Sequence, residues 1–271
     1  MPELPEVETT VRGLASVLEG RRIASVELRR ADLRRPFPPE LRQRLTGARV
    51  AGLRRRAKYG LIDTDRGDTL VFHLGMSGCW RIDPVALGPH DHFLLGTDQG
   101  RRLALNDPRR FGSLDLVATD RLETSEPFAR MGPEPLGESF DGRWLARALA
   151  GRRAPIKALL LDQHIVAGLG NIYVCEALHR AGIAPGRAGG QIAHARLERL
   201  AGAVKSVLRA AVEAGGSSLR NYARPDGELG YFSAEWRVYG REGEACPGCG
   251  APIRRRAEGG RSTFFCPKCQ R

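Results

Sequence analysis

Four cysteines near the end of the sequence have the spacing of a metal site. They form two pairs, Cys246-Pro-Gly-Cys249 and Cys266-Pro-Lys-Cys269, with 16 residues between the pairs. Each pair can bring two thiolates to one ion from a tight turn, and two such turns complete the tetrahedron of sulfur ligands that zinc prefers. Two disulfide bonds are the alternative, but nothing in the sequence marks a secreted protein. We therefore expect these four cysteines to hold one structural zinc ion.

The N-terminus offers a second kind of chemistry, because Pro2 follows the initiator Met1. Methionine before a small residue is normally removed, and Pro2 then exposes a secondary amine. Such an amine attacks a carbonyl-like carbon and forms an iminium, which acts as an electron sink. An α-amine has a reference pKa of ~7.7–8.0, so a useful neutral fraction exists at neutral pH. Glu3 is placed to move protons beside it. Taken alone, a proline at this position is far more often an ordinary N-terminal residue than a nucleophile.

Charge and composition narrow the class of partner. The 271 residues contain 43 Lys and Arg against 31 Asp and Glu, a net charge of +12. A charge excess of this size favours a polyanion, nucleic acid above all, over a small acidic metabolite, although composition alone could produce it. With 42% hydrophobic residues the chain can build real cores, which excludes wholesale disorder. No apolar run has the length of a membrane span, and the acidic start is not a signal peptide, so we expect a cytoplasmic protein.

The patterning separates a strand-rich half from a helical half. Apolar residues recur at helical spacing over residues 4–19, and short β-like segments follow over 23–117, which predicts a β-sandwich or barrel with a leading helix. Residues 118–140 lose periodicity and contain three prolines, as a linker does. Helical patterns then cover 141–150, 154–166, 171–181 and 191–214.

Glycine-rich and basic segments complete the helical half. Residues 167–170 form a short connection between two predicted helices, and 215–230 are polar and turn-rich, as in a mobile loop. The segment 233–271 has eight basic against four acidic residues, and a strand is expected at 262–265, ahead of the second cysteine pair. A basic, zinc-stapled hairpin suits contact with phosphates, and a purely structural cap is the alternative.

Blocks along nearly the whole sequence resemble the bacterial formamidopyrimidine-DNA glycosylases, which repair 8-oxoguanine. The blocks are Pro2–Glu8, Arg55–Tyr59, His73–Gly78, Asp107–Gly112, Gly168–Tyr173, Gly230–Phe232, Val238–Arg241 and the cysteine-rich finger. Related endonuclease VIII enzymes share Pro2, Glu3 and the finger but prefer oxidised pyrimidines. Leu4 and the Asp107–Gly112 block favour the purine enzyme.

The resemblance implies four catalytic residues. Pro2 is the nucleophile at C1′ of the damaged nucleotide, and Glu3 is the acid/base that assists opening of the sugar ring. Lys58 resembles a hairpin lysine that donates a proton in β-elimination and contacts phosphate. Arg261 matches a finger-tip arginine associated with phosphate binding and δ-elimination. Without the resemblance, a hairpin lysine or arginine is most often a solvated surface charge.

The resemblance also implies residues that contact DNA. Met76, Arg109 and Phe111 match three residues that fill the gap left by an everted nucleotide; core packing is the alternative for Met76 and Phe111. The other matched DNA contacts are His90, Arg152, Lys157, Asn171 and Tyr239. For His90 and Arg152 a solvated loop charge is a serious alternative. His73 is expected near phosphate rather than as a metal ligand, since no second ligand has suitable spacing.

Together these observations predict an α+β protein. It has an N-terminal β-sandwich domain with a leading helix and a C-terminal helix–two-turn–helix domain with a four-cysteine zinc-finger hairpin. The predicted segments are a catalytic domain (1–120), a linker (121–140), a helical domain with a lesion loop (141–232) and the finger (233–271). The expected activity is removal of 8-oxoguanine and formamidopyrimidines from duplex DNA by a monomer, followed by cleavage of the abasic site. A DNA-binding protein without chemistry is the rival.

Overall fold

The computed structural model describes residues 2–217, 225 and 230–271. Their packing divides the chain into two compact units. Unit 1 is Met1–Ala129 with Ala214–Tyr231, and unit 2 is Arg130–Glu213 with Phe232–Arg271. Within the described residues, no helix combines the length and the apolar character that crossing a membrane requires.

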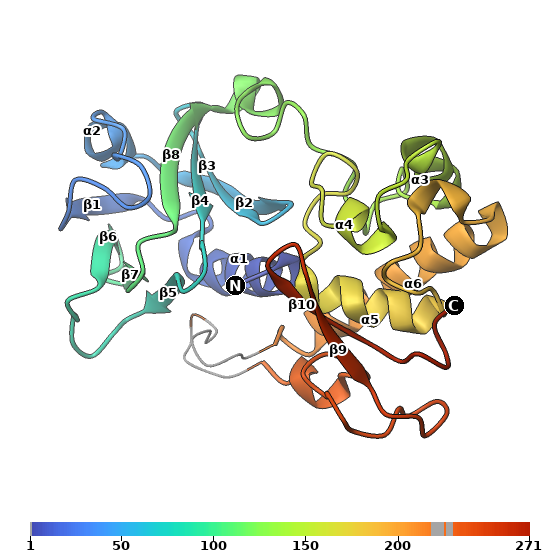
Figure 1. Ribbon diagram of the computed structural model, residues 1–271. Coiled ribbons are helices and arrows are strands. Elements are labelled where there is room, and N and C mark those ends of the chain that lie inside the picture. The colour runs from blue at the N-terminus through green and yellow to red at the C-terminus, as the bar shows by residue number, and fades with distance from the viewer. Residues whose placement is uncertain (1, 218–224, 226–229) are drawn as a thin grey trace. The chain divides into compact units, whose positions relative to one another are not determined.

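Two four-stranded antiparallel sheets build unit 1, where the sequence predicted short strands (Figure 1). The first sheet has the order β1 (Ile23–Leu28), β6 (Asp91–Thr97), β7 (Arg102–Asn106) and β5 (Cys79–Ile82). The second has the order β2 (Val50–Arg56), β3 (Tyr59–Thr64), β4 (Asp68–His73) and β8 (Ser113–Ala118). Short α2 (Leu41–Leu45) and the 3₁₀ turn η1 (Thr119–Thr124) complete the unit.

Aromatic side chains join the two sheets of unit 1. The rings of Phe72 on β4 and Trp80 on β5 lie 5.6 Å apart, and Trp80 packs edge-on against Phe93 on β6 at 5.9 Å. Gly60 on β3 leaves the space for Phe72, because a Cβ at Gly60 would lie 2.0 Å from that ring. This shared core, together with α1, confirms the predicted sandwich.

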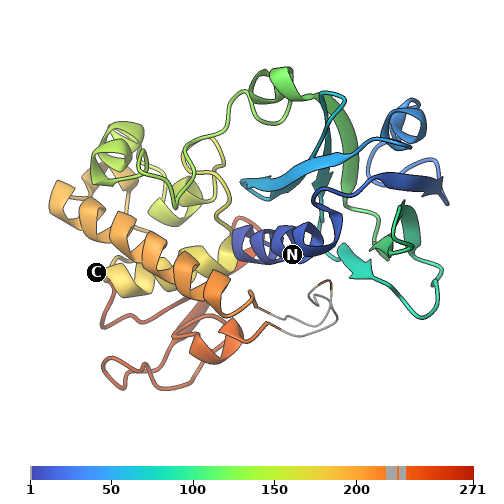
Figure 2. The same ribbon diagram turned by 180° about the vertical axis from the view of Figure 1, so that it is seen from behind.

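Helix α1 (Leu4–Leu18) covers the core of unit 1 and confirms the helix expected over 4–19. Its buried face is built from residues four or three apart, Val7, Val11, Leu14 and Leu18. The helix packs against β2, β3 and β5, and Figure 2 shows it alongside β2. The N-terminus of the chain is therefore held against the sheets by a helix that begins almost at once.

Unit 2 consists mainly of helices and the finger. The helices are α3 (Gly142–Leu149), α4 (Ile156–Leu160), α5 (Asn171–Ala181) and α6 (His194–Glu213), with 3₁₀ turns η2 (Gly189–Gln191) and η3 (Phe232–Glu235). α6 packs on α3 and α5. The finger hairpin pairs β9 (Arg254–Glu258) with β10 (Arg261–Phe265), and β10 lies against α5 (Figure 1). The strand expected at 262–265 is confirmed.

One predicted helix of unit 2 was too long. The pattern over 154–166 predicted a single helix, but α4 ends at Leu160. Local polar contacts break it: Asp162 Oδ1 accepts the backbone N–H of His164 at 3.0 Å, and the Gln163 amide donates to the carbonyls of Leu161 and Leu169. Such side-chain bonds to nearby backbone offer an alternative to the helical pattern. The connection to α5 is therefore longer than the expected residues 167–170, and most of the expected loop at 215–230 lies outside the described residues.

Candidate active site and nucleic-acid contacts

The start of the chain is fixed by a carboxylate that the sequence analysis did not single out. Pro2 and Glu3 are buried, and Glu3 is the N-cap of α1. The Glu3 side chain accepts the backbone N–H of Glu6, while the Glu6 carboxylate accepts the N–H of Glu3 at 2.8 Å, which forms a capping box. The other oxygen of Glu6 accepts the N–H of Ser217 at 2.7 Å. The spacing of Glu3 and Glu6 was the available signal for this role.

Lys58 sits in the turn of a hairpin tied to the same helix. Ala57 and Lys58 form the two-residue turn between β2 and β3, and Ala57 has a left-handed backbone (φ 54°). Arg55 Nε donates to Glu8 on α1 at 3.0 Å, and its Nη1 donates to the Ala57 carbonyl at 2.9 Å. With only 8% of its side chain exposed, Arg55 is a firm link between the turn and α1. Through Arg55 and Glu8, the turn that carries Lys58 is therefore attached to α1, the helix that begins directly after Glu3.

A second buried carboxylate organises the loops expected to contact DNA. Asp107 is 0% exposed; its Oδ1 accepts the hydroxyl of Ser77 at 2.7 Å, and its Oδ2 accepts the N–H of Gly112 at 2.8 Å. Its own N–H donates to the carbonyl of His90 at 3.0 Å. Asp107 therefore gathers the loop after β4, the segment before β6 and the loop after β7. In the sequence, Asp107 stands out only as the first residue of the Asp107–Gly112 block.

The three residues expected to fill a gap in DNA are presented by these loops. Met76 and Phe111 are 41% and 44% exposed, unlike core side chains of their size, so simple core packing does not account for them. The Arg109 guanidinium lies 4.7 Å from the centre of the Phe111 ring. The backbone N–H of Arg109 donates to Ser77 Oγ at 3.3 Å, which ties this loop to that of Met76. Exposed apolar wedges next to a cation suit insertion between bases.

His73 faces a pocket of unit 1 as a neutral imidazole. Its Nδ1 accepts the N–H of Gly75 at 3.0 Å, so the single proton of the neutral ring lies on Nε2. Burial, then the positive charge of Lys58, lowers the pKa of His73 to about 4. The cavity, about 360 Å³, is lined by Arg34, Arg35, Tyr59, His73, Phe111, Ser113, Glu126 and Pro127. The His73 ring therefore keeps one N–H donor, and the cavity that it lines also contains two arginines and the carboxylate of Glu126.

The lowered pKa of His73 predicts how the stability of unit 1 depends on pH. The unfolded chain takes up a proton near pH 6.5, whereas folded His73 resists it down to about 4, so stability is full above 6.5 and falls as pH drops toward 4. Between pH 8 and pH 5 the free energy of unfolding should fall by about 2 kcal/mol from this residue. In His73→Asn, whose amide oxygen can still accept from Gly75, denaturant titrations should show that much less pH dependence. Equal slopes in both proteins would contradict the neutral imidazole.

In unit 2, Lys157 and Asn171 hold the finger hairpin rather than pointing to solvent. Lys157 is 2% exposed, and its ammonium donates to Thr263 Oγ1 at 2.7 Å and to the Ser262 carbonyl at 3.3 Å. The Asn171 amide, at the start of α5, donates to the same carbonyl at 2.9 Å. Burial lowers the pKa of Lys157. Both residues therefore fix the backbone directly after Arg261.

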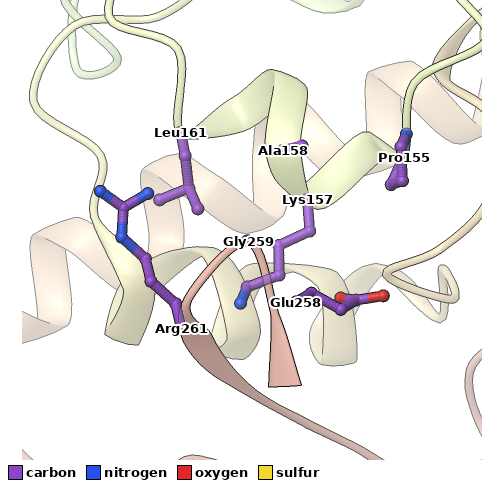
Figure 3. A pocket seen from close by; sticks show the side chains of 7 residues that line it. All are labelled: Pro155, Lys157, Ala158, Leu161, Glu258, Gly259 and Arg261. Carbon is purple, nitrogen blue, oxygen red and sulfur yellow. The ribbon is translucent and has the colours of Figure 1, made fainter. Parts of the chain in front are cut away.

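Arg261 is an exposed cation at the start of β10 in the finger. It borders a cavity of about 380 Å³ lined by Pro155, Lys157, Ala158, Leu161, Glu258, Gly259 and Arg261 (Figure 3). In Figure 3 the Arg261 guanidinium lies beside Leu161, while the Lys157 ammonium turns toward the hairpin. The Thr263 hydroxyl accepts a hydrogen bond from Lys157 and donates one to Glu258 at 2.8 Å. This hydroxyl therefore bridges the lysine ammonium and a carboxylate. Arg261 is exposed, whereas Lys157 is engaged inside unit 2.

The remaining expected contacts of unit 2 have different surroundings. Arg152 is exposed, with its Nε donating to the Ala148 carbonyl at 2.8 Å. The Tyr239 ring packs on Phe264 of the finger at 5.0 Å, and its backbone N–H donates to Glu176 at 2.9 Å. Glu176, 1% exposed, also accepts the N–H groups of the two residues before Tyr239. This anchoring carboxylate on α5 was not identified from the sequence.

The four finger cysteines have the geometry of a tetrahedral sulfur site. Their sulfur atoms all lie within 4.8 Å of one another. Cys246 and Cys269 are 3.8 Å apart and Cys249 and Cys266 are 3.5 Å apart, sulfur to sulfur. Zinc–sulfur bonds of ~2.3 Å require edges of about 3.8 Å, whereas a disulfide needs about 2.05 Å. The donor set and its spacing therefore fit one structural zinc ion, as predicted.

Sequence comparison decides the family. The profile of the formamidopyrimidine-DNA glycosylase N-terminal domain matches residues 1–114, that of its H2TH domain matches 131–223, and a zinc finger found in FPG and IleRS matches 243–271. The chain belongs to the formamidopyrimidine-DNA glycosylase family. The expected helix–two-turn–helix domain and finger are confirmed by the same matches.

Individual formamidopyrimidine-DNA glycosylases are similar over their full length. Those of Rhizorhabdus wittichii and Novosphingobium aromaticivorans are 69% and 65% identical, covering 100% of both chains. The crystal structure of the Thermus thermophilus enzyme has a TM-score of 0.90 at 42% identity, covering 99% of this chain and 98% of that one. A Lactococcus lactis variant in complex with DNA containing Fapy-dG has a TM-score of 0.93 at 36% identity, covering 100% of both. Another Lactococcus lactis complex contains an abasic site.

Proposed function

We propose that this chain is a base-excision repair enzyme that removes 8-oxoguanine and formamidopyrimidines from duplex DNA and then cleaves the abasic site. The observation that carries the proposal is the fixed N-terminus: Pro2 and Glu3 are buried at the start of α1, and a capping box with Glu6 holds Glu3, the residue bonded to Pro2. An ordinary first proline needs no such support. The Lactococcus lactis relatives bound to Fapy-dG and abasic DNA support the same substrate class.

Pro2 performs the covalent step. Once Met1 is removed, its amine attacks C1′ of the damaged nucleotide, and the bond from C1′ to the base breaks with the electron pair leaving on the base. Glu3 exchanges the proton needed for the sugar ring to open, and an iminium remains between the Pro2 nitrogen and C1′. The capping box supports this role because it holds Glu3, which is bonded directly to Pro2.

Two cations serve the elimination steps. The iminium makes the neighbouring C2′ proton acidic, so β-elimination expels the 3′ phosphate, with Lys58 supplying a proton. A second elimination expels the 5′ phosphate and is assisted by Arg261, which binds phosphate. The tie of the Lys58 turn to Glu8 and the fixing of Ser262 next to Arg261 support these roles.

The exposed triad of unit 1 compensates for the everted base. Eversion costs a few kcal/mol of stacking. Met76 and Phe111 fill the resulting gap, and Arg109 hydrogen-bonds the cytosine left without a partner. The buried Asp107 supports this assignment because it fixes the loops that carry all three. His90, Arg152, Lys157, Asn171 and Tyr239 remain proposed DNA contacts or supports of such contacts. The protein acts as a cytoplasmic, nucleoid-associated monomer.

Borohydride trapping tests the function directly. The protein is incubated with duplexes containing 8-oxoguanine opposite cytosine or thymine glycol, reduced, and the covalent adduct is quantified. Adduct formation mainly on the 8-oxoguanine duplex is expected. Preference for thymine glycol would indicate the pyrimidine specificity of endonuclease VIII. Tight binding without any adduct would favour a DNA-binding protein that lacks chemistry.

A further inference from the structure

One face of α5 carries the finger. Asn171, Cys175 and His179 are spaced four residues apart, so they lie along one side of the helix. Asn171 donates to the carbonyl of Ser262, and Cys175 packs in the cluster that contains Cys246 and Cys266. The finger is therefore docked on this helix along its length, and His179 lies toward its C-terminal end.

His179 reaches the metal site itself. Its Nε2 lies 3.4 Å from Cys246 Sγ, and only 7% of the residue is exposed. Its other ring nitrogen, Nδ1, is buried and has no hydrogen-bond partner among the described residues. The position of the ring is thus set by the sulfur contact and by packing, with no competing polar partner on Nδ1 within the described part of the chain.

The direction of the hydrogen bond follows from the chemistry of the ligand. A zinc-bound cysteine is a thiolate and has no proton to donate, so the proton in this contact lies on Nε2 of His179. Four thiolates around one Zn²⁺ leave a net charge of −2, and N–H donors stabilise that charge. The backbone N–H of Gly248 also points to Cys246 Sγ, at 3.4 Å. That donor is local to the turn, whereas His179 comes from a helix outside the finger.

We propose that His179 is a supporting residue of the zinc centre, whose hydrogen bond to Cys246 strengthens zinc retention and couples α5 to the finger. The inference depends on the cysteine site and does not depend on the catalytic roles proposed above. It predicts that zinc affinity is partly determined in the helical part of unit 2. Loss of an outer-shell donor of this kind typically weakens metal binding about 10- to 100-fold.

Three variants of the full-length, zinc-loaded protein test this role. His179→Phe removes the donor and keeps a ring, His179→Gln keeps an N–H that can reach the sulfur, and His194→Phe is a control at a histidine whose side chain is 56% exposed. Zinc transfer to pyridylazoresorcinol is followed by absorbance at equilibrium. We expect about 10- to 100-fold weaker zinc binding in His179→Phe, a small change in His179→Gln, and none in the control.

Two results would contradict the proposed role of His179. Wild-type zinc affinity in His179→Phe would show that the hydrogen bond contributes nothing. Equal loss in the Phe and Gln variants would show that an N–H donor at this position does not restore zinc binding. Both results overturn the proposal. Alkylation of the cysteines by a maleimide gives an independent readout, because a thiolate that loses a donor and holds zinc less tightly should react faster in His179→Phe than in His179→Gln.

Discussion

Blocking the Pro2 amine is expected to lower the borohydride-trapped adduct by at least about a thousand-fold, the scale seen when an enzyme loses its nucleophile. An uncleaved N-terminal extension converts the nitrogen into a tertiary amide, whose electron pair is no longer available for attack on C1′. The matched control carries the same extension at the C-terminus. Mass spectrometry establishes which residue begins each protein, and trapping on an 8-oxoguanine duplex measures the effect.

A second variant separates chemistry from obstruction. Pro2 is buried, so an extension could also disturb the site sterically. Pro2→Gly leaves a primary amine that still forms an imine, so some lyase activity on an abasic duplex should remain while base excision weakens. An adduct of wild-type yield on the extended protein would rule out Pro2 as the nucleophile, whatever the Gly variant does.

The sequence predicted the parts of the protein that depend on local patterns. The apolar spacing of α1, the short β-like segments of the N-terminal half and the two cysteine pairs each reflect a short-range rule, and the structure confirms them. α4 shows the limit of such rules. Its apolar pattern continues past Leu160, but Asp162 and Gln163 engage the nearby backbone and end the helix. Side-chain competition of this kind is invisible to hydrophobic periodicity.

The residues missed from the sequence are buried carboxylates that hold loops. Asp107 and Glu176 accept backbone N–H groups from segments that are 5 and 61–63 residues away in sequence, respectively. A carboxylate can hold a loop only when the fold brings unpaired backbone N–H groups around it. The residue type alone therefore does not predict which Asp or Glu takes this role. Glu6 differs from these two, because its partner Glu3 is only three residues away, the spacing found in capping boxes.

Lys157 shows how burial changes the meaning of a basic residue. Its charge and its place in the family's pattern suggested a DNA contact, yet its ammonium donates to Thr263 and the Ser262 carbonyl. At 2% exposure the side chain offers little surface to a phosphate. A buried lysine of this kind fixes the groups to which it donates hydrogen bonds. Here it fixes the backbone of Ser262, the residue that follows Arg261. The DNA contact expected of Lys157 stays a prediction, and its hydrogen bonds favour the role of a support for the finger backbone next to Arg261.

Removing the zinc ligand Cys249 tests how much of DNA binding depends on the finger. Cys249→Ser should lose roughly one zinc per chain, and the finger should unfold, because a hairpin of this size has too small a core to fold without the metal. Hydrogen exchange should then be fast in β9 and β10 and unchanged in the strands of unit 1, whose aromatic core is separate. Cys79→Ser is the matched control, since Cys79 lies outside the finger, on β5.

The same variant should bind DNA about 10- to 100-fold more weakly, since a charge-assisted hydrogen bond such as that of Arg261 to phosphate contributes about 1.5–3 kcal/mol. The loss should be similar for duplexes with cytosine or adenine opposite an uncleavable abasic analogue, because phosphate carries no sequence information. The salt dependence should also become shallower by about one phosphate contact. Full affinity without zinc would mean that Arg261 contributes no binding energy. A loss confined to the cytosine duplex would instead place base readout in the finger.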